Sequence, residues 1–136
     1  MRVMAVDYGD ARTGVAVSDE TRTLVGDAWV IAEKNAEALA GKIADEARRR
    51  GVSLVVLGYP RNMNGSVGDR ALKSEKLAGV LRGQHGLEVE LWDERLTTVD
   101  AHRILTETGS FGKKRKRTVD AVAASLILEG YLRSKE

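Results

Sequence analysis

Acidic residues stand at separated positions of the chain where, once brought together, they could hold a metal ion. Asp7 follows an apolar run, and Asp120 stands near the start of the last helical pattern. Between them, Asp93 and Glu94 end a strand-like pattern. Carboxylate oxygens are the ligands that hard cations such as Mg2+ and Mn2+ prefer. One or two such ions would supply a nucleophile at neutral pH and neutralise the charge on both oxygens of a phosphodiester during hydrolysis.

Each acid also has a structural interpretation that needs no metal. An aspartate at a strand end, such as Asp7, is ordinary turn chemistry. Asp120 would interact well with the dipole of the helix that it opens, and Asp93 or Glu94 could pair with Arg95. The catalytic interpretation gains weight only if the fold brings the acids to one place.

Short strands and amphipathic helices are expected to position these acids. The apolar spacing predicts a helix from residue 36 that ends at Gly51, where a C′ glycine is typical. The continuous apolar run at 54–57 predicts a strand buried on both faces. Further strands are expected at 3–6, 13–18, 23–31 and 88–96. Further helices are expected at about 70–84, after a cap at Thr97 or Thr98, and at about 119–133 with Thr118 as N-cap. The last helix is expected to face the core through Val119, Val122, Ala123, Leu126 and Ile127.

The element order predicts an α/β fold with a single mixed five-stranded sheet. A three-stranded antiparallel meander comes first, and two crossovers add two strands parallel to the first, with helices against the faces. In such sheets ligands bind at the carboxyl ends of the parallel strands. Asp7, the loop at 59–65 and the acids at 93 and 94 all belong to that edge, and residues 1–136 are expected to form one domain.

The hairpin after Asp7 is glycine-bearing. Gly9 and Gly14 predict a turn in which the backbone adopts a positive φ or in which something approaches closely. A carboxylate beside such a turn suits a divalent cation and a phosphate. Arg12, in the same turn, could contact that phosphate.

The strand pattern leaves open which of two adjacent acids completes the set. Asp93 continues the face of Leu91, whereas Glu94 shares the face of Trp92. Strand ends often break alternation, so both acids remain candidate metal ligands.

Composition excludes several classes of protein. The chain contains no cysteine, so a disulfide scaffold and a thiolate metal site are excluded and oxygen ligands for Mg2+ or Mn2+ are favoured. The N-terminus enters a strand pattern with no leader-like run, and we expect a cytoplasmic location. The net charge is only +2, so the distribution of charge says more than its sum.

Basic residues are concentrated near the predicted acidic edge. The run at 113–117 is expected to lie in a loop before Asp120, where it could grip a polyanion such as nucleic acid. A solvated charged face is the alternative interpretation. The candidate contacts with phosphate or ribose are Arg12, Arg61, Asn62, Arg95, Lys113, Lys114, Arg115, Lys116 and Arg117.

Four sequence blocks together resemble the YqgF family, also called RuvX. The blocks are DYGDARTGVA at 7–16, GYPRNMNGS at 58–66, DERLTT at 93–98 and KRTVDAVAA at 116–124. Members of that family are described as Holliday-junction-resolvase-like and as pre-16S rRNA nucleases. The resemblance covers essentially the whole chain, and the four blocks occur in the family's order.

The resemblance implies an RNase H-like fold, a cytoplasmic location and a nuclease that depends on a divalent metal and matures the 5′ end of 16S rRNA. It implies metal binding by Asp7, by Glu94 or its neighbour Asp93, and by Asp120, and it makes Lys116 the basic residue before the last acid. Asn64 stands where the family commonly has aspartate, so the resemblance assigns no metal to that loop.

Two other functions remain open at this point. A resolvase would cut four-way DNA junctions with the same chemistry. A ribosome assembly factor would bind RNA without turnover and would show no cleavage that depends on Mg2+ or Mn2+.

Overall fold

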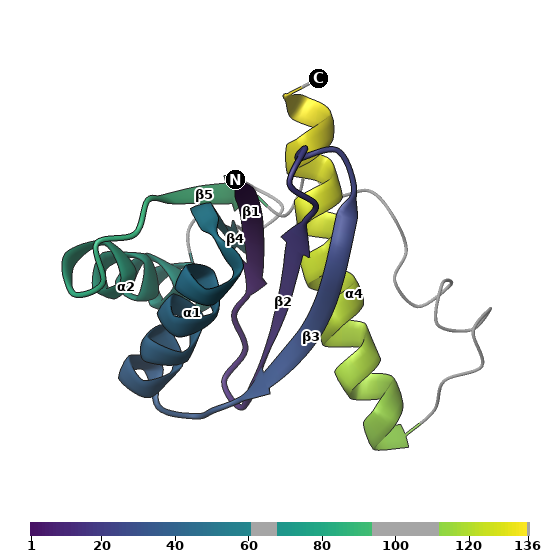
Figure 1. The fold of residues 1–136 in the computed structure, drawn as a ribbon. Coiled ribbons are helices and arrows are strands. Elements are labelled where there is room, and N and C mark those ends of the chain that lie inside the picture. Colours follow the sequence, from purple (N-terminus) through teal and green to yellow (C-terminus); the bar gives the residue numbers. More distant parts are fainter. Residues whose placement is uncertain (61–67, 94–111, 136) are drawn as a thin grey trace.

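The computed structural model describes residues 1–60, 68–93 and 112–135, with the backbone alone at 112–118. Figure 1 shows an opening run of strands followed by helices that alternate with strands. The described elements are β1 Arg2–Asp7, β2 Arg12–Ser18, β3 Val25–Ala32, α1 Ala36–Arg50, β4 Val52–Tyr59, α2 Asp69–Gly83, β5 Val89–Asp93 and α4 Gly112–Ser134. The short helix expected after Thr98 lies outside the described residues.

The strands form one mixed five-stranded sheet in the order β3-β2-β1-β4-β5. β2 pairs antiparallel with both β1 and β3, whereas β4 pairs parallel with β1 and β5. The predicted α/β arrangement of a meander and two parallel strands is therefore confirmed. The carboxyl ends of β1, β4 and β5 meet at one edge of this sheet, which is called the carboxyl edge below.

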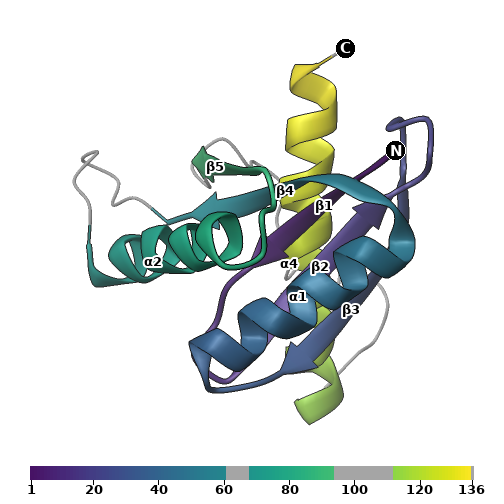
Figure 2. The same cartoon turned by 60° about the vertical axis from the view of Figure 1, so that its left-hand side comes forward.

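Helices cover both faces of the sheet, with α1 and α2 on one face and α4 on the other (Figure 2). Successive strand residues point to opposite faces and so fill two hydrophobic cores. On β1, Met4 and Val6 belong to the core under α1 and α2, whereas Val3 and Ala5 belong to the core under α4. The face of any strand residue can therefore be read from its neighbours.

The two tryptophans lie against different cores. Trp29 of β3 packs against the core under α1 and α2. Trp92 of β5 packs against the core under α4, where its ring lies edge to face with Tyr131 at a centroid distance of 5.9 Å. Edge-to-face pairs add to the free energy gained by burying the rings.

Residues just outside α1 explain why this helix forms where the sequence predicts it. The side chain of Asn35 accepts a hydrogen bond of 2.9 Å from the backbone N–H of Ala38, which is the usual role of an N-cap residue. Gly51 follows the last turn with a φ of 69°, a left-handed conformation that favours glycine. The buried side chains repeat at helical spacing and are Leu39, Ala40, Ile43, Ala44 and Ala47.

The start of α4 differs from the prediction. The helix begins at Gly112, so the basic run at 113–117 lies in its first turns and not in a loop, and Thr118 is not an N-cap. Lysine and arginine are good helix formers, and no proline interrupts the segment, so the helix extends through the charged residues. In Figure 1 these turns lie at the lower end of α4, the end at which β1 finishes.

The buried face of α4 also differs in part. Leu126 and Ile127 are buried as predicted, whereas Val119, Val122 and Ala123 are only half-buried. The remaining buried positions are Ala124, Leu128, Tyr131 and Leu132. Apolar residues occupy more than one side of this segment, so spacing alone does not select the face that meets the sheet. Within the described ranges, no helix is both long and apolar enough to cross a membrane.

Candidate active site

Asp7 and Asp120 lie on the same side of the sheet. Val3 and Ala5 face the core under α4, and Asp7 follows them on β1 with the same alternation. Asp7 pairs in register with Gly14 of β2. Asp120 stands on α4 itself, so the first and last acids of the predicted metal-binding set lie at the carboxyl edge on the α4 face.

Gly14 is the point at which the strand and the helix touch. A Cβ atom built on Gly14 would lie 1.9 Å from the carbonyl oxygen of Asp120 and 2.6 Å from its carbonyl carbon. No side chain can occupy that space, so only glycine lets the α4 backbone approach β2 this closely. The close approach that the sequence predicts for Gly14 is confirmed, and it fixes Asp120 beside the strand that pairs with Asp7.

The turn between β1 and β2 is equally tight. A Cβ atom on Gly9 would lie 2.1 Å from the carbonyl oxygen of Arg12. The backbone N–H of Gly9 donates a hydrogen bond of 3.3 Å to the hydroxyl of Thr13, which is fully buried. Gly9 and Gly14 serve close contacts and not a positive φ, since the glycines with positive φ in the described chain are Gly51 and Gly86.

Arg12 is the cation nearest to Asp120 in the described part of the chain. Its Nε lies 3.5 Å from Oδ2 of Asp120, and the two side chains are 36% and 30% exposed. Partial burial raises the pKa of the Asp120 carboxyl, and the charge of Arg12 opposes this shift without cancelling it. The carboxylate of Asp120 is thus held in a site that disfavours its charge.

Two residues of α2 hold the same hairpin turn from the other side. Arg70 donates a hydrogen bond of 3.1 Å to the carbonyl oxygen of Tyr8, and Nζ of Lys73 lies 3.1 Å from Oδ1 of Asp10. Neither residue is predicted from the sequence, because α2 gives only a weak helical pattern and the contacts join distant segments. A pair of cations in the first two turns of a helix that follows a polar loop is the signal that could have indicated them.

Asp93 reaches the carboxyl edge but faces away from Asp120. It ends β5 beside Tyr59 of β4. Val89 and Leu91 face the core under α1 and α2, and the alternation of β5 places Asp93 with them. Trp92, the residue before it, faces the core under α4.

Several predicted site residues cannot be placed. Glu94, Arg95, Arg61 and Asn62 lie outside the described residues. The basic run at 113–117 is placed by its backbone alone, in the first turns of α4. Within the ranges that are described, no group of three or more acids, histidines or cysteines is close enough to hold a metal ion.

Comparison with known proteins relates this chain to nucleases. A family model described as "RuvX: Holliday junction resolvase" matches residues 1–134. A relative from Pelotomaculum thermopropionicum, named "Putative pre-16S rRNA nuclease", is 43% identical over 136 residues, which cover 99% of this chain and 88% of the relative.

Solved structures with the same fold include two resolvases. RuvC of T. thermophilus, in complex with a Holliday junction substrate, has a TM-score of 0.63 at 15% identity over 99% of this chain and 96% of that one. The fowlpox virus resolvase, in complex with Holliday junction DNA, has a TM-score of 0.59 at 12% identity over 99% of both chains. These likenesses, with the sheet order, show the RNase H-like fold that the family resemblance implies.

Proposed function

Because the chain belongs to the RuvX family of nucleases, hydrolases that act on phosphodiester bonds, we propose that it cleaves precursor 16S rRNA near the 5′ end of the mature RNA. The single observation that supports the site of this reaction is the contact at Gly14. It places Asp120 against β2, at the strand position that pairs with Asp7. The proposal includes a cytoplasmic location and one RNase H-like domain over residues 1–136.

The donor set at the carboxyl edge fits Mg2+ or Mn2+. Asp7 and Asp120 offer carboxylate oxygens on one face, and the chain has no cysteine that would favour a softer metal. The pKa of Asp120 is raised by burial, so a cation at this carboxylate would offset the cost of its charge. A bound ion would supply a water nucleophile and neutralise the charge on the phosphodiester oxygens.

Glu94 is the third acid of the proposed set. Asp93 shares the face of Val89 and Leu91 under α2, opposite the face of Asp120. The family resemblance of the sequence implies that this ligand is Glu94 or its neighbour Asp93. We therefore assign the third ligand to Glu94 and not to Asp93.

The basic residues around this edge are proposed to bind the RNA backbone. The run Lys113, Lys114, Arg115, Lys116 and Arg117 begins α4 two turns before Asp120, at the carboxyl edge. Cations beside an acidic site offset the repulsion between the carboxylates and a polyanion. Arg12, Arg61, Asn62 and Arg95 are proposed to make further contacts with phosphate or ribose.

Replacement of Asp7 by Asn tests the reaction. A 5′-extended 16S precursor, incubated with Mg2+, should be cleaved at least about 100-fold more slowly by Asp7→Asn than by the natural protein, because a ligand oxygen is lost. Asp10→Asn is the matched control: it makes the same chemical change in the same turn at a side chain that is 69% exposed and pairs with Lys73. Cleavage by Asp7→Asn at the natural rate would refute the proposed role of Asp7.

Cleavage of four-way DNA junctions is the second candidate, and the description of the matching family model favours it. Both substrates should be offered to the same preparation of enzyme. A resolvase would cut the junction symmetrically and leave the RNA precursor intact, which would overturn the proposed substrate. Binding of RNA without cleavage in either Mg2+ or Mn2+ would instead indicate a non-catalytic assembly factor.

A further inference from the structure

Arg12 occupies the same corner of the fold as the two described acids of the proposed site. On β2, Arg12, Gly14 and Ala16 alternate onto the α4 face, where Ala16 belongs to the core and Gly14 meets α4. Its guanidinium approaches Oδ2 of Asp120. The guanidinium of Arg12 is therefore already paired with a carboxylate oxygen of Asp120 that the proposed function assigns to a metal ion.

This ion pair is suited to exchange. The closest approach, at 3.5 Å through Nε, is longer than a hydrogen bond, and both side chains are about one-third exposed. Ion pairs with this exposure contribute little net free energy. The main chain of Arg12 is fixed by the tight turn at Gly9, so its side chain can leave Asp120 by rotation while the hairpin stays in place.

A divalent cation and the Arg12 guanidinium compete for Asp120. Arginine stays protonated at any pH at which the protein folds, so deprotonation cannot relieve the repulsion between the two positive groups. Metal binding at Asp120 must therefore displace the guanidinium or become weaker because of it. Once displaced, a guanidinium at the start of β2 has donors arranged to bind a phosphate.

We propose that Arg12 exchanges partners, pairing with Asp120 in the metal-free protein and with a phosphate of the nucleic acid once Asp120 binds a divalent cation. This inference rests on the proposed function, because it assumes that Asp120 is a metal ligand. The exchange makes metal and nucleic acid bind cooperatively. By linkage, each ligand then raises the affinity for the other by the same factor.

The first test is calorimetric titration of Mn2+ into the protein without nucleic acid. Arg12→Ala should bind Mn2+ roughly two- to fivefold more tightly than the natural protein, the change expected from a partly exposed ion pair. Arg12→Lys keeps the charge and should bind Mn2+ nearly as weakly as the natural protein. Lys42→Ala is the matched control, because it removes a positive charge that pairs with Glu33 at 3.0 Å on a different part of the molecule.

The second test measures RNA binding by anisotropy of a labelled precursor hairpin, once in EDTA and once in Ca2+, a cation that carboxylates also bind. In EDTA the natural protein and Arg12→Ala should bind the RNA equally well, because the guanidinium of Arg12 is then paired with Asp120. In Ca2+ Arg12→Ala should bind about three- to tenfold more weakly, because a charge-assisted phosphate contact is lost. Lys42→Ala should match the natural protein in both buffers.

Three outcomes would overturn the inference. Weaker or unchanged Mn2+ binding by Arg12→Ala would show that Arg12 does not compete for Asp120. An equal loss of RNA affinity in EDTA and Ca2+ would show a fixed phosphate contact without exchange. If the natural protein binds no Mn2+ at all, the metal site of the proposed function fails as well, so the first titration separates the two failures.

Discussion

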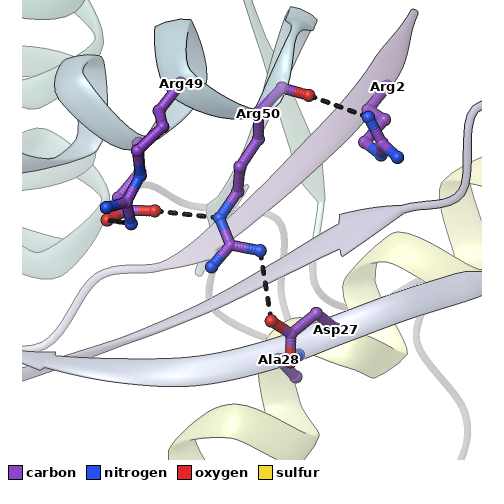
Figure 3. A network of polar contacts seen from close by, with 6 residues as sticks. Arg2, Asp27, Ala28, Arg49 and Arg50 are labelled. Carbon is purple, nitrogen blue, oxygen red and sulfur yellow. Dashed lines mark hydrogen bonds and ion pairs between the residues drawn. The ribbon is translucent and has the colours of Figure 1, made fainter.

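Carboxylates at the two ends of the sheet are held in opposite ways. At the end where β1 begins, the carboxylate of Glu46 accepts hydrogen bonds from Arg49 and, at 2.8 Å, from Nε of Arg50. Arg50 also reaches Asp27 at 3.1 Å (Figure 3). Arg50 also lies over the ring of Trp29 at 4.0 Å. These four charged residues are called the Glu46 cluster. Hydrogen bonds from Arg49 and then Arg50 lower the pKa of Glu46 below its ordinary value.

At the carboxyl edge, Asp120 has the opposite surroundings. A single arginine approaches it at 3.5 Å, and burial raises the pKa of its carboxyl. Two arginines approach Glu46, whereas one more distant arginine approaches Asp120. The difference in surroundings distinguishes an ion-pair network that stabilises the fold from an acid whose charged form would be stabilised by a further cation.

Substitution of Gly14 should have the largest effect, since the carboxyl edge depends on it. Gly14→Ala would press a methyl group into the backbone of Asp120 and should lower the free energy of unfolding by about 3 kcal/mol or more. Gly41→Ala, in α1 on the other face, meets nothing within 4 Å and should raise it by about 0.5–1 kcal/mol. Urea unfolding of both variants measures the contrast, and equal effects would contradict the close approach.

Replacement of each acid by its amide should separate a loss of stability from a loss of activity. Glu46→Gln should lower the free energy of unfolding by about 1 kcal/mol, because partly exposed ion pairs are lost, and leave cleavage near the natural rate. Asp120→Asn, measured in EDTA, should leave stability within about 0.5 kcal/mol of the natural protein while cleavage in Mg2+ falls at least about 100-fold. An equal loss of stability in both variants, with cleavage retained in both, would contradict the different roles of Glu46 and Asp120.

The effect of Glu46→Gln should depend on pH. Folding lowers the pKa of Glu46 from its ordinary value of 4.5, so its charged form stabilises the fold at pH values above 4.5. This contribution is lost as the pH falls through the pKa of the folded state. The difference in unfolding free energy between the natural protein and Glu46→Gln should therefore shrink as the pH is lowered from 6 to about 3. A difference that stays constant over this range would show that the charge of Glu46 is not its cause.

Lys73→Ala should have the smallest effect on stability. Its ion pair with Asp10 joins side chains that are 54% and 69% exposed, so the change in unfolding free energy should be below about 0.5 kcal/mol. Thermal unfolding and the cleavage assay, run beside Glu46→Gln, measure it. A larger loss of stability would show that α2 holds the hairpin turn mainly through this lysine.

Much of the fold could be predicted because its signals are local. The run at 54–57 and the glycine at 51 mark a strand and a helix end, and the helical crossovers then predict which strands run parallel. The start of α4 could not be predicted in the same way. A basic run preceded by glycines is compatible with a loop or a helix, and packing of the following turns on the sheet decides between them.

The site was predictable as a set of acids but not as an arrangement. The approach of Arg12 to Asp120 joins the two ends of the chain, and no spacing in the sequence encodes it. The pairing of Gly14 with the helix backbone is equally non-local. Alternation on β5 distinguishes the face of Asp93 from that of Trp92 only after the cores on either side of the sheet are known.

The placement of the tryptophans gives each hydrophobic core its own fluorescent reporter. Trp29 lies under the guanidinium of Arg50 on the α1 side, and Trp92 lies beside Tyr131 on the α4 side. The chain has two tryptophans, so replacing either one by phenylalanine leaves a single emitter on a known face of the sheet. Emission spectra of the two variants during unfolding would therefore show directly whether the two layers separate from the sheet together or in succession.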